Sequence, residues 1–317
     1  LVTFIIIARN AGDKIDSLFV DLVNQDYPKK SIELILVDSD SKDDTKERML
    51  RFYKENEYIY NNILILDNPK ITLPAGWNVA LSQAHGEVIL RVDAHSSIPN
   101  DFISKNVELI KSGEAITGGH RISIIENDSN LQKTLLAAET SLFGSGFASY
   151  RRGCSGDRLY VDSLAHAAYK TDVFIKVGGY DERLRRTEDN EMHYRMRKAG
   201  YKFCCSSDIK SYHHARSSVW QMIKQKYLNG LWIGRTIGIC PQCFSLFHFI
   251  PLVFVCMIIF TAGLAAVGFA FPAIAMWLLY VVLTVIMTAM AMKKDGFVVT
   301  HLMLPLLFLL LHLAYGI

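Results

Sequence analysis

The distribution of charge divides this chain into two parts that suit different solvents. All but three of its 65 Asp, Glu, Lys and Arg residues lie in the first 235 positions. The other three form the run Lys293-Lys294-Asp295, and residues 236–292 and 296–317 contain no charge. A soluble core seldom continues for 57 residues without a charged side chain. The sequence therefore predicts a water-exposed region followed by a membrane-embedded one, and argues against both a purely soluble protein and a transporter-sized bundle.

The apolar region is long enough for three membrane-spanning helices. A span needs about 20 apolar residues, and the sequence offers Phe244–Ala270, Ala273–Met292 and Phe297–Ile317. Pro272 interrupts the run after the first segment, because proline lacks the amide hydrogen that a helix interior uses. The run Lys293-Lys294-Asp295-Gly296 then separates the second segment from the third.

Basic residues near the apolar segments predict how the chain is oriented. Lys293 and Lys294 mark their loop as cytoplasmic by the positive-inside rule. Two crossings earlier, the first region ends on the same side. Ser217–Arg235 spaces apolar residues at helical intervals among basic ones, which predicts a helix lying on the bilayer, with packing against the soluble region as the alternative. We therefore expect a soluble domain over 1–216, a connector over 217–240 and a membrane region over 241–317.

The soluble region alternates between short apolar runs and amphipathic stretches, which predicts an α/β domain with a mostly parallel sheet. The expected strands are Val2–Ala8, Ile32–Val37, Ile63–Leu66 and Val88–Val92, and the expected helices between them are Lys14–Asn24, Asp43–Lys54 and Trp77–Ala84. Ligands of such sheets gather at the carboxyl ends of the strands. Asn10, Asp38, Asp93 and His95 stand at those ends.

Several kinds of nucleotide site are absent from the sequence. No Gly-x-Gly-x-x-Gly follows the first strand and no P-loop occurs, so the phosphates of a nucleotide would need a metal, basic side chains or both. Asp93 and His95 are alternate residues at a strand end and can face one cleft, where they suit Mg²⁺ or Mn²⁺; an ordinary Asx turn is the alternative. A net charge of +3 gives no indication of a nucleic-acid partner.

Two later features add candidate functional groups. Thr187-Glu188-Asp189 fits the beginning of a helix that ends near Gly200, where the helix dipole favours ionised carboxylates. Capping alone would explain Glu188, but it does not explain what lies just upstream. The Gly178-Gly179-Tyr180 turn and the basic residues Arg183, Arg185 and Arg186 would together suit an anionic ligand. The Tyr212-His213-His214 segment is a second candidate for a metal ligand, with a structural role as the alternative.

The motifs occur in a recognisable order. They are Ile5–Asn10, Val37–Thr45, Gly76–Glu87, Asp93–His95, Val177–Glu182 and Thr187–Asp189. In this order and spacing they resemble glycosyltransferase family 2, inverting enzymes with a GT-A fold, over nearly the whole soluble segment. The nearest resemblance is to membrane-anchored transferases of exopolysaccharide synthesis. His95 departs from the usual pattern, since it stands where the family carries the second aspartate of Asp-x-Asp.

The resemblance implies roles for particular residues. Asp189 would be the general base with Glu188 beside it, and Asp93, His95 and His213 would bind Mn²⁺ or Mg²⁺. The implied nucleotide-sugar contacts are Ala8, Arg9, Asn10, Asp38, Asp40, Gly76, Asn78, Arg91 and Asp93. The implied acceptor contacts are Arg151, Arg152, Asp162 and His166.

The implied reaction is metal-dependent inverting transfer from a nucleotide-diphosphate sugar, a UDP-sugar, to a lipid-linked glycan such as a sugar on polyprenyl diphosphate. The implied location is a bacterial-type plasma membrane, with several crossings and the catalytic domain on the cytoplasmic side. One alternative is a polyprenyl-phosphate sugar synthase. A second is an inactive membrane scaffold that still binds a sugar nucleotide, which the His95 departure favours. Cellulose-synthase-like processivity is disfavoured, because no Gln-x-x-Arg-Trp follows Asp189.

Overall fold

The computed structural model describes residues 1–144 and 158–317. By their contacts, the described residues form two units, one of residues 1–122 and 158–213 and the other of residues 123–144 and 214–317. The sequence predicted one continuous soluble domain over 1–216. The structure instead groups residues 123–144 with the C-terminal helices, because the apolar face of that segment packs there.

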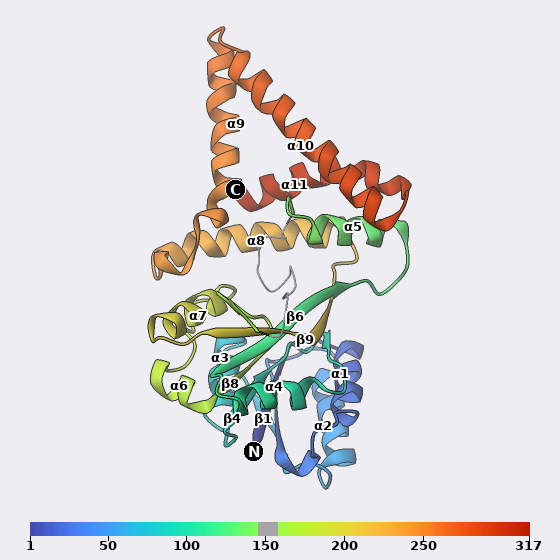
Figure 1. Ribbon diagram of the computed structural model, residues 1–317, viewed down its shortest axis with the longest axis vertical. Coiled ribbons are helices and arrows are strands. Elements are labelled where there is room, and N and C mark those ends of the chain that lie inside the picture. The colour runs from blue at the N-terminus through green and yellow to red at the C-terminus, as the bar shows by residue number, and fades with distance from the viewer. Residues whose placement is uncertain (145–157) are drawn as a thin grey trace. The chain divides into compact units, whose positions relative to one another are not determined.

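The first half of the sheet is parallel, as the sequence predicts. Strands β1 (Val2–Ala8), β2 (Ile32–Asp38), β3 (Asn62–Asp67) and β4 (Val88–Arg91) lie in the order β3-β2-β1-β4. Helices α1 (Asp13–Val23), α2 (Thr45–Asn56) and α3 (Leu73–Leu81) connect them. Each predicted strand and helix of this half is confirmed to within a few residues of its ends (Figure 1).

The second half makes the sheet mixed. Strand β8 (Ala167–Lys170) runs antiparallel to both β4 and β6 (Ile116–Ile124). The long strand β9 (Phe203–His214) runs antiparallel to β5 (Ser96–Ser97) and β7 (Leu159–Val161). The candidate segment Tyr212-His213-His214 forms the end of this twelve-residue strand.

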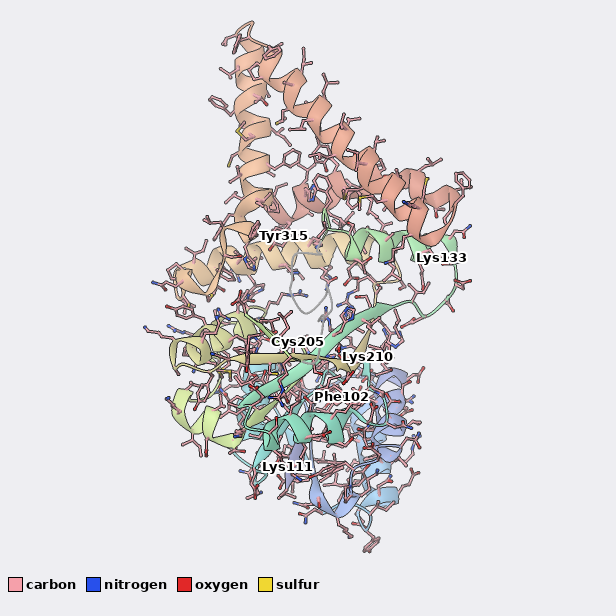
Figure 2. All side chains as sticks on the ribbon, in the orientation of Figure 1. Phe102, Lys111, Lys133, Cys205, Lys210 and Tyr315 are labelled. Carbon is pink, nitrogen blue, oxygen red and sulfur yellow. The ribbon has the colours of Figure 1, made fainter. Side chains whose placement is uncertain are left out.

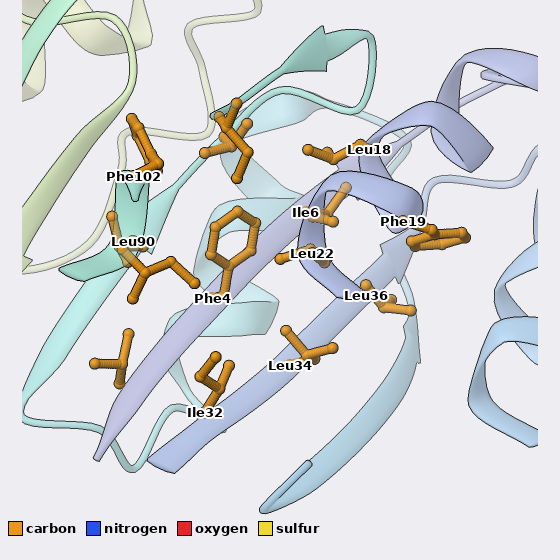
Figure 3. Close-up of a cluster of buried hydrophobic side chains, with 14 of the residues drawn as sticks. Phe4, Ile6, Leu18, Phe19, Leu22, Ile32, Leu34, Leu36, Leu90 and Phe102 are labelled. Carbon is orange, nitrogen blue, oxygen red and sulfur yellow. The ribbon is translucent and has the colours of Figure 1, made fainter. Parts of the chain in front are cut away.

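The alternation of side chains along β1 supplies both faces of the sheet. Phe4 and Ile6 enter a core with residues of α1, α2 and α4 (Phe102–Lys111). Figure 3 shows Phe4 and Ile6 with Leu18, Phe19 and Leu22 of α1 and Phe102 of α4. Ile5 and Ile7 enter the opposite core, with residues of α3, α6 (Thr171–Val177) and α7 (Glu188–Lys198). Because β1 is covered on both faces, its sequence is a continuous apolar run rather than an alternating one.

The second unit is helical. It contains α5 (Asn130–Thr140), α8 (Val219–Ile237), α9 (Ile250–Ala266), α10 (Phe271–Asp295) and α11 (Leu304–Gly316), with short 3₁₀ turns at Pro241–Cys243, Leu246–Phe249 and Val299–Met303. Three stretches among the described residues are long and apolar enough to cross a membrane: Leu246–Ala266, Phe271–Lys294 and Val299–Gly316. They correspond to the three segments that the sequence predicts.

Helices α5, α8 and α11 share an apolar core of their own. Leu135 and Ala138 of α5 and Met222 of α8 are buried with four residues of α11. In Figure 1, α5, α8 and α11 run in nearly the same direction, while α9 and α10 form a hairpin that projects away from them. Side chains project outward along α9 and α10 in Figure 2, and most of the residues of these two helices are exposed and apolar.

Candidate active site

The candidate site is organised around one buried arginine at the end of β4. The guanidinium nitrogen Nη2 of Arg91 lies 3.5 Å from Oδ2 of Asp189 and 3.7 Å from Oε1 of Glu188. Both carboxylates occupy the first turn of α7, as the sequence predicted. The Arg91 side chain is 5% exposed and the Glu188 side chain 3%, whereas the Asp189 side chain is 35% exposed. Of the pair, Asp189 therefore faces the open side.

Two aromatic rings hold the guanidinium in place. Its central carbon lies 4.8 Å from the centre of the Trp77 ring and 5.6 Å from that of Tyr180, and Nη1 donates to the Tyr180 hydroxyl at 3.3 Å. A planar cation between aromatic faces gains both stacking and electrostatic attraction. Trp77 and Tyr180 come from α3 and from the turn after α6, so three separate segments fix the position of the charge.

The environment separates the acidities of the two carboxyl groups. Burial, reinforced by the negative charge of Asp189, raises the pKa of Glu188 well above its ordinary value. Burial also acts to raise the pKa of Asp189, but the charge of Arg91, the neighbouring His193 and a hydrogen bond with Glu188 together outweigh burial and hold that pKa below the ordinary value. Glu188 therefore holds the proton and Asp189 is the ionised group, which is the form that a general base requires.

A second cluster lies where β4 ends. Nε2 of the buried His166 lies 3.4 Å from Oδ2 of Asp93 and 3.2 Å from Oγ of Ser96. The rings of His95 and His213 meet edge to face with centres 5.1 Å apart, and His213 pairs with Ser96 across β5 and β9. Burial lowers the pKa of both His166 and His213, so both are neutral at pH 7.

The charge of Asp93 is stabilised where it stands. Burial alone would raise its pKa, but the hydrogen bond with His166 and the neighbouring charges, that of Arg91 included, hold the pKa well below its ordinary value. Arg91 interacts electrostatically with Asp93, Glu188 and Asp189 together. One cation thus joins the strand-end turn and the beginning of α7, which are almost a hundred residues apart in the chain.

The metal-binding residues predicted from the sequence lie together but do not form a complete ligand set. In the part of the chain that the structure describes, no three His, Cys, Asp or Glu side chains are placed to hold a metal ion. Nδ1 of His213 is nonetheless buried without a hydrogen-bond partner among the described residues, which is unusual unless a ligand completes it. Carboxylate and imidazole donors suit Mn²⁺ or Mg²⁺, and a cation here would take its remaining ligands from a bound diphosphate.

The predicted nucleotide contacts after β1 and after β2 lie in two neighbouring segments that are joined by hydrogen bonds. Asn10 and Asp40 both have positive φ, and Oδ1 of Asn10 accepts a hydrogen bond from the backbone N–H of Lys42 at 2.7 Å. Asp38 accepts one from the N–H of Ser41 at 3.3 Å, and its other carboxylate oxygen is buried without a partner among the described residues. Ala8 is buried and Arg9 exposed beside them. These strand-end residues remain candidates for the nucleotide.

Two other predicted nucleotide contacts make structural contacts within the protein, and their contact with a nucleotide stays a prediction. Gly76 is buried, and a Cβ on it would lie 2.7 Å from the Ile7 side chain, so it allows α3 to pack closely on β1. Asn78 donates to the Tyr180 carbonyl at 2.9 Å and to Glu182 at 3.0 Å, and it accepts from the Tyr180 N–H at 2.7 Å. The amide of Asn78 thus fixes the turn that contains Tyr180.

The predicted acceptor residues are not brought together. His166 lies against Asp93, in the cluster at the end of β4. Asp162 is exposed, and its carbonyl accepts a hydrogen bond from Arg197. Arg151 and Arg152 lie outside the described residues. An acceptor role for these four stays a prediction.

Sequence reasoning missed the residues that support the site. Trp77 and Tyr180 stood inside recognised motifs, but nothing local indicated that both would contact Arg91. His193, one turn after Asp189, lies 2.9 Å from Oγ of Ser163 and 3.2 Å from the Tyr169 hydroxyl, and burial lowers its pKa to about 3. Its spacing of four residues from Asp189 on one helix was the available signal.

Comparison with known proteins decides the family. The model of glycosyl transferase family 2 matches residues 3–178. The chain belongs to glycosyl transferase family 2. This family 2 glycosyltransferase is 28% identical over 221 residues to the succinoglycan biosynthesis protein ExoA of Rhizobium meliloti, a match covering 67% of this chain and 64% of that one. It therefore spans slightly less than two thirds of that relative's length.

Other relatives extend the likeness. Over 267 residues the chain is 27% identical to a Methanococcus voltae protein named as a dolichyl N-acetyl-alpha-D-glucosaminyl phosphate 3-beta-D-2,3-diacetamido-2,3-dideoxy-beta-D-glucuronosyltransferase, covering 81% of this chain and 80% of that one. The fold resembles the mannosyltransferase PcManGT of Pyrobaculum calidifontis, solved with GDP-Man and Mn²⁺, with a TM-score of 0.65 at 16% identity over 99% of this chain and 85% of that one. The GT-A-like fold expected from the motifs is confirmed.

Proposed function

We propose that this family 2 glycosyltransferase moves a sugar from a nucleotide-diphosphate sugar to a lipid-linked glycan, with inversion, and that Asp189 is the general base. The observation that supports this most directly is the arrangement around Arg91, which keeps Asp189 ionised and partly exposed beside a protonated Glu188. Asp93 shares the same cation, so the group expected at the donor diphosphate lies in the same electrostatic cluster.

The proposed reaction is a single displacement. An acceptor hydroxyl oxygen attacks the anomeric carbon, Asp189 takes the hydroxyl proton, and the bond from that carbon to the diphosphate oxygen breaks as the nucleoside diphosphate leaves. A bound divalent cation supplies positive charge for the leaving diphosphate. Asp93, His95 and His213 are the residues proposed to hold it. Asp38 and Asn10 are proposed to contact the nucleotide.

The proposed acceptor and donor rest on the names of two relatives and on the apolar helices of this chain. The name of the Methanococcus relative describes transfer to a dolichyl-phosphate-linked sugar, and that of the Rhizobium relative describes succinoglycan biosynthesis. Both names support a glycan acceptor, and the name of the Methanococcus relative supports a glycan that is linked to a lipid. A lipid-borne acceptor also suits a chain whose apolar helices could cross a membrane. A UDP-sugar is the proposed donor, and Lys293 and Lys294 favour a cytoplasmic position for the catalytic unit.

A donor and acceptor screen tests the reaction. Membranes containing the full chain are assayed with UDP- and GDP-sugars, and with either a polyprenyl-diphosphate-linked saccharide or a polyprenyl phosphate as acceptor. We expect transfer to the saccharide, with the anomeric configuration inverted. Transfer to polyprenyl phosphate alone would favour the synthase alternative, and nucleotide binding without any turnover would favour the scaffold. A product with retained configuration would contradict the mechanism.

Two matched substitutions test the base. Asp189→Asn is expected to lower turnover by roughly 10²- to 10⁴-fold, because the acceptor proton then has no base. Asp172 occupies the same position in the first turn of α6 and is exposed. Asp172→Asn is therefore expected to leave turnover unchanged. Full activity of Asp189→Asn would refute the base assignment.

Binding measurements test the metal separately from turnover. Chelation is expected to weaken nucleoside-diphosphate binding, and added Mn²⁺ to restore it. His95→Ala and His213→Ala should each reduce the Mn²⁺-dependent part of the affinity. His214 is the next residue of β9 and lies 4.0 Å from Glu126. His214→Ala is the control, and equal effects of His213→Ala and His214→Ala would exclude the proposed ligand.

A further inference from the structure

Helix α11 connects the two open ends of the α9–α10 hairpin, namely the end of α10 and the start of α9. At its beginning, Thr300 in the 3₁₀ turn before α11 donates to the Asn130 carbonyl at 2.8 Å and lies 2.7 Å from the Thr134 hydroxyl, both on α5. At its end, a Cβ on Gly316 would overlap the carbonyl oxygen of Pro251, the second residue of α9. The 3₁₀ turn before α11 follows closely after the end of α10 in the chain and also contacts α10, so α11 starts beside α10 and finishes where α9 starts.

The order of the helices along the chain limits where α11 can lie. Helices α9 and α10 are consecutive, joined by the short turn at residues 267–270, and run out and back (Figure 1). In any bilayer that this hairpin crosses, the start of α9 and the end of α10 are on the same side. A helix that connects those two points stays on that side.

Helix α11 is also short for a crossing. It has 13 residues, about 20 Å at the α-helical rise, against a hydrocarbon core of about 30 Å. The preceding turn adds five residues, but that turn is tied to α5. By contrast, α10 has 25 residues and is long enough to cross, even when tilted.

The faces of the helices suit an interfacial position. On α11 the buried residues are Leu304, Leu307, Phe308, Leu311 and Gly316, and the exposed ones, Leu306 and Leu310, are apolar. Helix α8, which packs against α11, instead exposes mostly polar and aromatic residues: Trp220, Gln221, Lys224, Tyr227 and Arg235, together with Gly234 and Ile237 near its end. In the pair formed by α8 and α11, one helix thus exposes apolar residues and the other exposes mostly polar and aromatic ones. This combination is typical of helices that lie at the boundary of lipid and water.

Close contacts hold α11 on this layer. A Cβ on Gly230 of α8 would overlap the Tyr315 carbonyl, so the two backbones touch there; Tyr315 is labelled in Figure 2. Nε2 of His312 donates to the Phe143 carbonyl at 2.7 Å, and its Nδ1 accepts from the Tyr280 hydroxyl at 3.0 Å. Both ring nitrogens are therefore satisfied in this arrangement, which joins α11 to α10 and to the segment after α5.

We propose that only α9 and α10 cross the bilayer, and that α11 lies in the plane of the interface with α5 and α8, against the headgroup and upper acyl region of the lipid. Residue 317 is then on the same side as α8. The hydropathy of Val299–Gly316 permits a third crossing. However, α11 begins and ends on the same side of the hairpin, so it does not cross. The inference rests on the proposed insertion in a membrane and is independent of the proposed reaction.

Epitope tags in the full chain test this placement. One tag is inserted after Gly268, one after Gly296 and one after Ile317, in three separate proteins. Gly268 and Gly296 both have positive φ and open space where a Cβ would be, so insertions there meet no neighbour. Each tag is probed with antibody in sealed spheroplasts before and after permeabilisation.

Two outcomes are decisive. We expect the tag after Gly268 to be accessible on the opposite side from the tags after Gly296 and Ile317, which should behave alike. A tag after Ile317 that behaves like the one after Gly268 would establish a third crossing and overturn the proposal. Three tags on one side would show that the hairpin does not cross at all, which would also overturn it. Neither result depends on enzymatic turnover.

Discussion

At the scale of single residues, Arg91 is where the separate parts of the candidate site meet. Its guanidinium contacts two carboxylates of α7 and the ring faces of Trp77 and Tyr180. The sequence suggested Arg91 only as a nucleotide contact. In the structure its guanidinium also pairs with protein groups and so helps to position Glu188 and Asp189, while the nucleotide contact stays a prediction.

Arg91→Met should destabilise the protein strongly. Removing one partner of a buried ion pair leaves the other charge uncompensated, which costs about 3–5 kcal/mol. Thermal unfolding in detergent would measure the loss. Arg183, with a 69% exposed side chain paired to Asp181, is the control, and Arg183→Met should change stability by less than about 1 kcal/mol. Equal melting temperatures for the two variants would contradict the role given to Arg91.

Glu188→Gln should stabilise the protein in a pH-dependent way. Because the folded-state pKa of Glu188 is raised, its contribution to stability is fully present below the unfolded pKa and is lost as the pH rises toward the folded one. Glutamine cannot ionise. The gain in melting temperature over wild type should therefore be absent near pH 4 and grow toward pH 8. A gain that does not change with pH would indicate a different cause.

At the scale of elements, helices could be predicted from local sequence patterns, whereas a strand that depends on long-range pairing could not. The amphipathic periods of α1, α2 and α8 were enough to predict these helices, because a helix is specified by residues three and four positions apart. Strand β6 was not predicted. Its Gly119 has no room for a side chain, because a Cβ there would overlap the carbonyl of Ile209 on β9. That need arises only when two distant strands pair.

The contact between α8 and α11 gives a prediction with a control on the same helix. Gly230→Ala should lower the melting temperature, because its methyl group would overlap the Tyr315 carbonyl and push the two helices apart. Gly234, one turn later, has open space at the same point. Gly234→Ala should be neutral or stabilising by up to about 1 kcal/mol. Equal effects of the two substitutions would mean that the close approach does not hold the helices together.

At the scale of the whole molecule, the described units are not continuous in sequence. The segment containing α5 leaves the sheet after β6 and packs with the C-terminal helices. A division of the chain at residue 216, which the sequence suggested, would separate α5 from the partners of its apolar face.

A chain ending at residue 216 should therefore fail to remain soluble on its own. The apolar residues Leu135 and Ala138, which are fully buried in the full chain, would be exposed to water. Size-exclusion chromatography without detergent is expected to show aggregates, and added detergent micelles to restore a monodisperse species. A monodisperse protein without detergent would contradict this prediction, because it would show that the apolar face of α5 is buried without the C-terminal helices.

By itself, the sequence determined that a charged region precedes an uncharged, apolar one, and it determined the parallel half of the sheet and the family. It also determined that Asp93, Glu188 and Asp189 stand at the ends of elements. Each of these follows from composition or from residues close together in the chain. The tertiary structure decided that Arg91 joins those carboxylates, that Gly76 and Asn78 serve packing, and that α11 returns to the start of α9. Such contacts depend on the path of the chain between residues far apart, and a local pattern does not contain that path.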